Sequence, residues 1–226
     1  LGSSYLVNIT KKIIESPKSK NYLIKNILDQ VDDNNTGTWA AILSSECKYP
    51  APSLTTAVEA RFISRQNRIF KNIKKTIKRK DYETKRIISD AQIITKISIA
   101  SCYLQGLGLL KEISKIKKIN FNFKSVILSW IKNSIIRSKL LERYLILAKK
   151  SNIDIEYLAK KEFSLKNREI LINFMKFTVK SNLFLPSSNS IFAWSNMLSN
   201  KKYISFSLIQ SQRNFFGSHK LKFLKK

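Results

Sequence analysis

The chain has 226 residues, 43% of them hydrophobic and 11% aromatic, and its 42 Lys and Arg outnumber its 15 Asp and Glu to give a formal net charge of +27. This apolar content excludes a disordered basic tail and suffices for one good-sized core or two small ones. The charge favours anions of any kind, from phosphorylated metabolites to RNA, and does not choose between them.

Apolar residues recur with helical period along almost the whole chain, and only five Gly and four Pro interrupt it. No segment shows the alternation of a strand, so the sequence predicts an all-α fold. The expected helices cover residues 5–14, 22–28, 39–47, 53–78, 90–115, 126–148 with a kink near 133–134, 155–180 and 190–198. We expect a helical domain at 1–206, followed by a projecting tail at 207–226.

The helix expected at 90–115 is the most hydrophobic of these, and small residues are spread among its large ones. Gly106 and Gly108 lower its helix propensity but allow neighbouring elements to approach closely. This mixture predicts a central helix with close neighbours on several sides.

The cysteines indicate structural thiols rather than a metal or disulfide site. Cys47 and Cys102 lie far apart without metal-like spacing, and the chain has a single His, so no zinc site is expected. Reduced, structural thiols favour a cytoplasmic protein, and we expect no signal peptide. We expect no membrane span, because Lys176 and Lys180 break the best apolar candidate at about 171–185.

A polar loop at 32–39 leads directly into an expected helix and contains Asn34, Thr36, Gly37 and Thr38. Free N–H groups at a helix start, with threonine hydroxyls beside them, form a cradle for an anion. An ordinary helix cap is the alternative interpretation, and by itself it is the more common one.

Arg61 lies in the segment 57–64 of the next expected helix. A guanidinium suits a phosphate because its planar fork donates two parallel hydrogen bonds. The alternative is that Arg61 belongs to a basic stripe with Arg65, Arg68 and Lys75, which would be solvated or would face a nucleic acid.

The tail segment 207–219 reads SLIQSQRNFFGSH and sets Arg213 and the only His of the chain, His219, on either side of Phe-Phe-Gly. We predict that Gly217 ends a helix in the left-handed conformation and turns the chain so that His219 returns beside Arg213. A lone His near a terminus is otherwise inert in most proteins.

These segments resemble the 6-phosphogluconate dehydrogenase family. The tail matches the family's C-terminal signature at Gln210, Gln212, Arg213, Phe215, Phe216, Gly217 and His219. The loop matches a Lys-Gly-Thr-Gly-Lys-Trp run at Thr36, Gly37 and Trp39, with Asn34 and Thr38 in place of its lysines, and the segments 57–61 and 103–106 match an Ala-Val-x-Ala-Arg segment and the central helix. The likeness covers essentially the whole chain and implies the family's helical C-terminal domain.

The resemblance also implies roles for particular residues. Arg61 would bind the substrate phosphate, and Thr36 and Asn34, which replaces a substrate-contacting lysine, would contact the substrate. Arg213 and His219 would reach into the other subunit of a homodimer and complete its pocket for 6-phosphogluconate.

The whole enzyme of this family would oxidise 6-phosphogluconate with NADP and decarboxylate it to ribulose 5-phosphate in the pentose phosphate pathway. The present sequence contains no Gly-x-Gly-x-x-Gly, and the family's catalytic Lys and Glu lie upstream of the matched region. We therefore expect a fragment that begins at Leu1, is inactive alone and binds no cofactor, while a separate N-terminal domain binds NADP.

Two other functions remain open from the sequence. The first is a degenerate, non-catalytic helical dimer module, which Asn34 and Thr38 favour, as do Lys132 and Asn133 in place of family glycines. The second is a basic nucleic-acid-binding protein, which ranks last because no nucleic-acid motif or aromatic stacking platform accompanies the charge.

Overall fold

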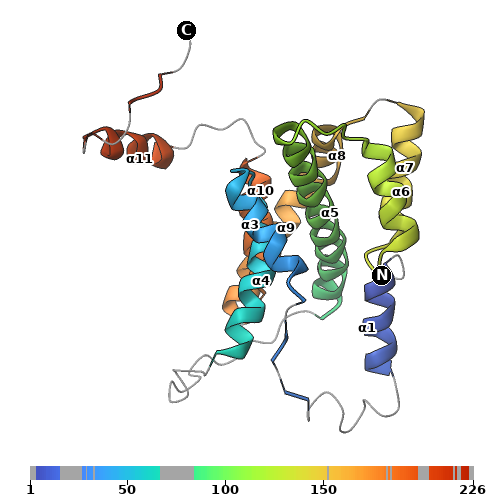
Figure 1. The fold of residues 1–226 in the computed structure, drawn as a ribbon. Helices are drawn as coiled ribbons and strands as arrows, with labels where there is room; N and C mark the ends of the chain where they lie inside the picture. Colours follow the sequence, from blue (N-terminus) through green and yellow to red (C-terminus); the bar gives the residue numbers. More distant parts are fainter. Residues whose placement is uncertain are drawn as a thin grey trace. The chain divides into compact units, whose positions relative to one another are not determined.

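The structure is a computed structural model, and it describes residues 4–15, 27–28, 30–32, 34–66, 84–151, 153–181, 183, 185–197, 204–215, 217 and 220–223. Every regular element in these ranges is a helix, which confirms the predicted all-α class (Figure 1). By its internal contacts the chain divides into unit 1, Leu1–Ser195, and unit 2, Asn196–Lys226, and each is described by itself.

The helices of unit 1 are α1 (Tyr5–Glu15), α3 (Thr36–Glu46), α4 (Pro52–Arg65), α5 (Thr84–Ile116), α6 (Phe123–Asn133), α7 (Lys139–Lys150), α8 (Ile155–Glu162), α9 (Leu165–Lys180) and α10 (Pro186–Met197), whose last two residues fall in unit 2. Unit 2 contains α11 (Ile204–Phe215). The predicted helices at 5–14, 39–47, 90–115 and 190–198 correspond to α1, α3, α5 and α10. Of the helix predicted at 22–28, only Ile27 and Leu28 are described, and they are not helical.

Two predicted long helices are each divided in the structure. The segment 126–148 falls in α6 and α7, and 155–180 is α8 and α9. A serine side chain caps the N-terminus of both α7 and α9. Ser138 Oγ accepts from the N–H of Leu141 at 3.3 Å, and Ser164 Oγ accepts from the N–H of Asn167 at 3.4 Å. A side-chain cap of this kind starts a new helix, although the apolar period continues across the break.

The prediction that one helix extends from 53 to 78 is wrong at its C-terminal end. Helix α4 ends at Arg65, because Gln66 adopts an extended backbone with ψ 139°. The rest of the predicted segment, from residue 67 onward, lies outside the described residues.

Helix α5 is the centre of unit 1. It packs against α3, α4, α8 and α9, and Figure 1 shows it between the α6–α7 pair and the helices α3, α4, α9 and α10. Its Ile97, Leu104 and Leu107 are buried in one core with Leu171 of α9 and Trp194 of α10. The central position predicted for this helix is therefore confirmed.

The same helix corrects the choice of 171–185 as the best apolar candidate for a membrane span. By length and composition alone, Ile88–Ile116 could cross a membrane, whereas the segment at 171–185 is not the strongest candidate. However, 56% of the most apolar window is buried inside the protein, and its side chains pack on α8 and α9. This packing is typical of a core helix.

Candidate functional site

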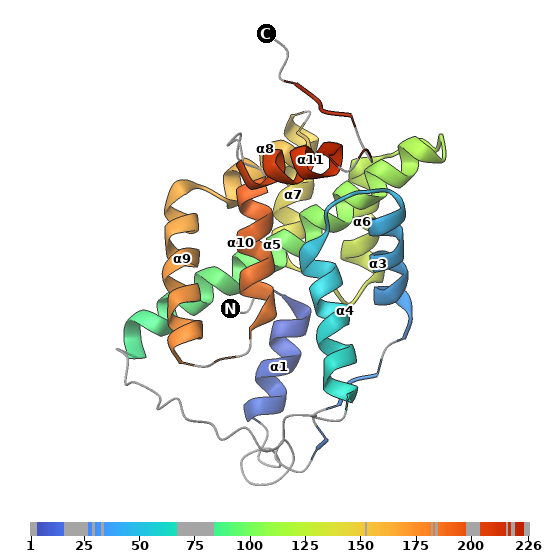
Figure 2. The same ribbon diagram turned by 90° about the vertical axis from the view of Figure 1, so that its left-hand side faces the viewer.

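The first group of predicted site residues lies on the α3–α4 pair of unit 1. A tight turn joins the two helices: Ser44 Oγ donates to the carbonyl of Tyr49 at 2.7 Å, and the N–H of Tyr49 donates to the carbonyl of Ser44 at 2.9 Å. The helices run back along each other, so the start of α3 and the end of α4 lie at the same end of the pair (Figures 1 and 2).

The start of α3 carries the predicted anion cradle. Asn35, which precedes the helix, has a left-handed backbone with φ 65°, and its side chain makes no capping hydrogen bond. Its carbonyl begins the helix by accepting from the N–H of Trp39 at 2.8 Å. Asn34 and Thr36 flank Asn35 and are exposed to solvent. A helix start without a side-chain cap, next to exposed amide and hydroxyl groups, is suited to an anion.

Arg61 lies near the end of α4 and is half-buried. Ser64 Oγ donates to the carbonyl of Arg61 at 2.7 Å and accepts from the N–H of Val31 at 3.0 Å. This contact holds the segment that enters α3 against the end of α4. The structure thus brings the loop of Asn34 and Thr36 to the end of the pair where Arg61 lies.

The basic stripe that was the alternative role for Arg61 can be followed only in part. Arg65 is exposed, and its guanidinium lies 5.2 Å from the centre of the Phe62 ring. Arg68 and Lys75 lie outside the described residues.

The start of α4 is held by a buried group that the sequence did not single out as part of the site. We call Ser53, Ser101, Gln105 and Ser190 the Gln105 cluster. Gln105 Oε1 accepts from the N–H of Ser53 at 2.8 Å, and Gln105 Nε2 donates to Ser53 Oγ at 2.9 Å and to Ser101 Oγ at 2.8 Å. Ser190 Oγ of α10 lies 3.5 Å from Ser53 Oγ.

Gln105 satisfies an N–H of α4 that no intrahelical partner can reach. It thereby fixes the first turn of the helix that carries Arg61 against α5. The glutamine in the middle of the most apolar helix could have indicated this contact from the sequence. A buried side-chain amide is costly unless it is hydrogen-bonded, so such a residue points to polar partners nearby.

The second group of predicted residues lies in unit 2. Beyond α11, Gly217 has φ 72°, and its N–H donates to the carbonyl of Asn214 at 2.9 Å. The prediction of a left-handed Gly217 after the helix is therefore confirmed. His219 lies outside the described residues, so its predicted return beside Arg213 stays a prediction.

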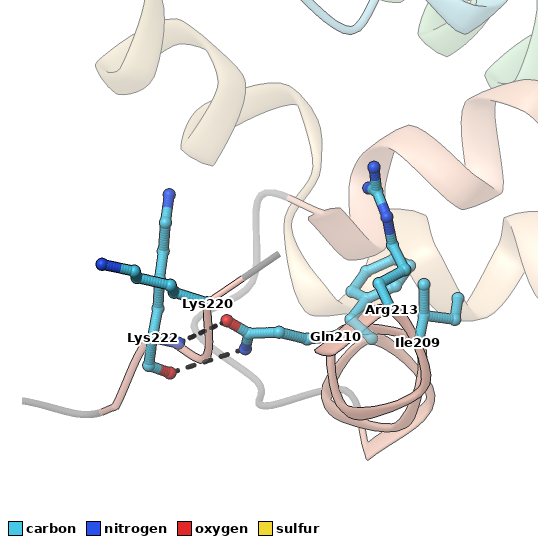
Figure 3. Close-up of a pocket in the computed structure, with 6 residues that line it drawn as sticks. Ile209, Gln210, Arg213, Lys220 and Lys222 are labelled. Carbon is cyan, nitrogen blue, oxygen red and sulfur yellow. Dashed lines mark hydrogen bonds between the residues drawn. The ribbon is translucent and has the colours of Figure 1, made fainter. Parts of the chain in front are cut away.

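The chain nevertheless comes back to α11 at Lys222, within the segment 220–223. Gln210 Oε1 accepts from the N–H of Lys222 at 2.6 Å, and Gln210 Nε2 donates to the Lys222 carbonyl at 3.5 Å (Figure 3). Between α11 and this segment lies an open cavity of about 570 Å³, which we call the tail cavity. It is lined by Phe206, Ile209, Gln210, Arg213, Lys220 and Lys222.

Among the described residues that line the tail cavity, three have cationic side chains and none is a carboxylate. Arg213 was predicted from the sequence, but Lys220 and Lys222 were missed. Their spacing of two was a usable signal, because alternate residues of an extended segment lie on the same side. Arg61 and Arg213 lie in different units.

The Cys102 thiol lacks the lowered pKa of a reactive cysteine. Both cysteines are free thiols, and burial raises the pKa of Cys102 to about 11, which keeps it protonated near neutral pH.

Comparisons with known proteins agree with this description. The family model for the 6-phosphogluconate dehydrogenase C-terminal domain matches residues 1–226. A decarboxylating 6-phosphogluconate dehydrogenase from Buchnera aphidicola subsp. Acyrthosiphon pisum is 27% identical over 226 residues, which cover 96% of this chain and 48% of that protein. The decarboxylating 6-phosphogluconate dehydrogenase 1 of Spinacia oleracea is 23% identical, with 96% and 47% covered. This chain thus spans about half the length of these relatives.

The fold has a solved counterpart. Plasmodium falciparum 6-phosphogluconate dehydrogenase, determined in its apo form and in complexes with NADP+ and 6-phosphogluconate, superimposes with a TM-score of 0.80 at 23% identity. The match covers 99% of this chain and 50% of that one, so the likeness extends over the whole helical fold. Together with the family match, it shows that the chain belongs to the 6-phosphogluconate dehydrogenase family and corresponds to its C-terminal domain.

Proposed function

We propose that this chain is the substrate-binding and dimerisation part of a cytoplasmic, decarboxylating 6-phosphogluconate dehydrogenase. The reaction converts 6-phosphogluconate and NADP to ribulose 5-phosphate, CO2 and NADPH. The single observation that carries this proposal is the family match over residues 1–226. The decarboxylating activity of the relatives supports the reaction class.

The role of this chain is to bind and orient the sugar phosphate. Arg61 and Arg213 would each donate charge-assisted hydrogen bonds to the phosphate, and Thr36 and the start of α3 would donate to the substrate nearby. His219 would complete the pocket from the tail. Asn34 would donate a neutral hydrogen bond where the family has a lysine.

The sequence of this chain contains no Gly-x-Gly-x-x-Gly, the motif that holds the pyrophosphate in a dinucleotide-binding fold. We assign NADP, which accepts the hydride when bound, to an N-terminal domain, along with the catalytic Lys and Glu. The 226 residues alone are expected to be inactive.

Unburied apolar faces support a homodimer that exchanges tails. Helix α1 is amphipathic but has no buried residue, and its Leu6 and Ile14 are 44% and 58% exposed. On α11, Leu208 and Phe215 are 58% and 86% exposed. Exposed apolar surface on two helices is typical of a protein whose partner covers it.

The test is Arg213→Ala in this chain joined to an intact N-terminal half of a family member. Losing a charge-assisted hydrogen bond costs about 1.5–3 kcal/mol, so we expect KM for 6-phosphogluconate to rise about 10- to 100-fold while kcat changes little. Lys149→Ala, at the exposed end of α7, is the control and should change neither constant. An unchanged KM in Arg213→Ala would contradict the phosphate role.

A degenerate, non-catalytic dimer module is the second candidate, and Asn34 and Thr38 in place of lysines favour it. The same joined protein separates the two candidates. In an enzyme, Asn34→Lys should lower KM, because it adds an ammonium beside a dianion. A degenerate module shows no turnover with either residue at position 34.

A further inference from the structure

The Gln210 side chain makes two hydrogen bonds with the main chain of Lys222, in the way that a neighbouring β-strand pairs with a peptide group. Its carbonyl oxygen accepts from the Lys222 N–H at 2.6 Å, and its amide nitrogen lies 3.5 Å from the Lys222 carbonyl oxygen. A side-chain amide carries both a donor and an acceptor, as a peptide group does. One residue of α11 therefore holds a segment that is twelve positions further along the chain.

This contact places positive charges around one cavity. Lys220 and Lys222 line the tail cavity together with Arg213 of α11, and Phe206 and Ile209 supply its apolar wall. The three side chains carry like charges, which repel one another to an extent that falls with distance. The hydrogen bonds from Gln210 hold the segment of Lys222 to α11 against that repulsion.

We propose that Gln210 is a positioning residue, which holds the returning tail so that Lys220 and Lys222 complete, with Arg213, a three-cation site for the phosphate of a sugar phosphate. The identity of the ligand rests on the function proposed above, whereas the contact between Gln210 and Lys222 does not. The cavity of about 570 Å³ has room for a phosphorylated sugar, and its cations match a phosphate dianion.

The hydrogen bonds of Gln210 with Lys222 involve only main-chain atoms of Lys222. Substitutions can therefore test the placement of the segment and the charges of its lysines independently. Lys222→Gln removes an ammonium and leaves the hydrogen bonds of the segment in place. Gln210→Leu removes those bonds and keeps all three cations. Gln210→Glu keeps an acceptor for the Lys222 N–H but adds a negative charge to the cavity wall.

The first measurement is amide hydrogen exchange of the C-terminal segment in the 226-residue chain, read by mass spectrometry. Loss of its acceptor in Gln210→Leu should speed exchange of the Lys222 N–H by about 5- to 30-fold. Gln212→Leu is the matched control, since Gln212 lies on the same helix and is exposed. Gln210→Glu and Lys222→Gln should exchange nearly as slowly as the unchanged chain. Equal exchange in Gln210→Leu and Gln212→Leu overturns the positioning role.

The second measurement is titration of the same proteins with inorganic phosphate, followed by calorimetry. We expect Lys222→Gln and Lys220→Gln each to weaken phosphate binding about 5-fold or more, and Gln210→Glu to weaken it although its exchange is slow. Lys149→Gln and Lys150→Gln, which remove equal charge from the end of α7, control for the net charge of +27. Equal losses in these controls overturn the three-cation site.

A separate measurement tests the function proposed above: turnover of 6-phosphogluconate by this chain joined to an N-terminal half. If that protein does not turn over the substrate, the dehydrogenase function is contradicted. Hydrogen exchange and phosphate titration still decide the role of Gln210 and of the two lysines.

Discussion

Two glycines of α5 show how single residues set the packing of unit 1. A Cβ atom at Gly108 would lie 1.7 Å from Oη and 2.3 Å from Cζ of Tyr49, whereas one at Gly106 would lie 3.1 Å from Cη2 of Trp130. Tyr49 follows the turn between α3 and α4, so the absence of a side chain at Gly108 allows that turn to lie against α5.

We predict that Gly108→Ala destabilises the protein by about 1–3 kcal/mol, because the Tyr49 ring must move from its packed position. Gly106→Ala is the matched control. Trp130 needs to shift only slightly there, and alanine gains about 1 kcal/mol of helix propensity, so its effect should be near zero. Urea denaturation of the two variants measures the difference. Equal stability would show that Tyr49 is not held against α5.

The Cys102 thiol gives a prediction for alkaline pH. Burial raises its pKa from 9.0 to about 11, so between these values the unfolded chain releases the proton and the folded chain keeps it. The free energy of unfolding therefore falls as pH rises from 9 to 11, by up to about 2 kcal/mol from this group. Burial also raises the pKa of Tyr49 and Tyr103, which adds to the loss above pH 10.

Cys102→Ala should remove the thiol's share of this dependence. Denaturation at pH 8, 9 and 10 should show a shallower decline in the free energy of unfolding than in the unchanged chain. The same slope in both proteins would contradict the shifted pKa.

At the scale of elements, polar contacts decide how the helices of unit 1 are joined. Tyr103 Oη of α5 donates to the carbonyl of Ile136 and lies within hydrogen-bond distance, 2.9 Å, of Ser138 Oγ. These contacts fix the connection between α6 and α7. The N–H of Tyr5 donates to the carbonyl of Arg137 at 3.1 Å and attaches the start of α1 to the same connection. The Gln105 cluster joins α4, α5 and α10 through buried hydrogen bonds in the same way.

We predict that Gln105→Leu destabilises unit 1 by about 1–3 kcal/mol, since it leaves the buried Ser53 N–H without its acceptor. Ser190→Ala is the milder comparison, because Ser190 Oγ lies at the limit of hydrogen-bond distance from Ser53 Oγ, and it should cost under about 1 kcal/mol. Thermal unfolding of both variants tests the difference. A smaller loss in Gln105→Leu than in Ser190→Ala would show that Gln105 does not hold the start of α4.

At the scale of the whole molecule, the pocket proposed above combines residues from two subunits of a homodimer. Arg61 lies in unit 1 and Arg213 in unit 2, while α1 and α11 present apolar side chains to solvent. A partner that covers these helices and exchanges its tail would join the two cations at one phosphate.

Mixed dimers test this arrangement. In a joined protein, dimers that combine an Arg61→Ala subunit with an Arg213→Ala subunit should recover up to about half of the normal activity, because one of the two pockets then contains both arginines. Each variant alone should bind 6-phosphogluconate weakly, and steady-state kinetics after subunit mixing reads the recovery. Activity no greater than that of the separate variants would contradict tail exchange.

The sequence by itself determined the helical class, the central position of α5, the left-handed Gly217 and membership of the family. Each of these depends on local properties: the apolar period, the conformational freedom of glycine and the identity of short segments. The same local signal indicated only a kink near 133–134, where α6 ends, and missed the break at 163–164, because an apolar period can continue through a change of direction.

Only the tertiary structure decided which polar groups meet. Gln105 pairs with Ser53 across 52 positions, and Gln210 pairs with Lys222 across twelve, so neither contact is visible in the spacing of residue types. Lys220 and Lys222 likewise became candidate ligands only when the returning chain brought them to the cavity that Arg213 also lines. Such pairings depend on how distant segments approach in the folded chain, and a buried amide or a held tail has its partner only there.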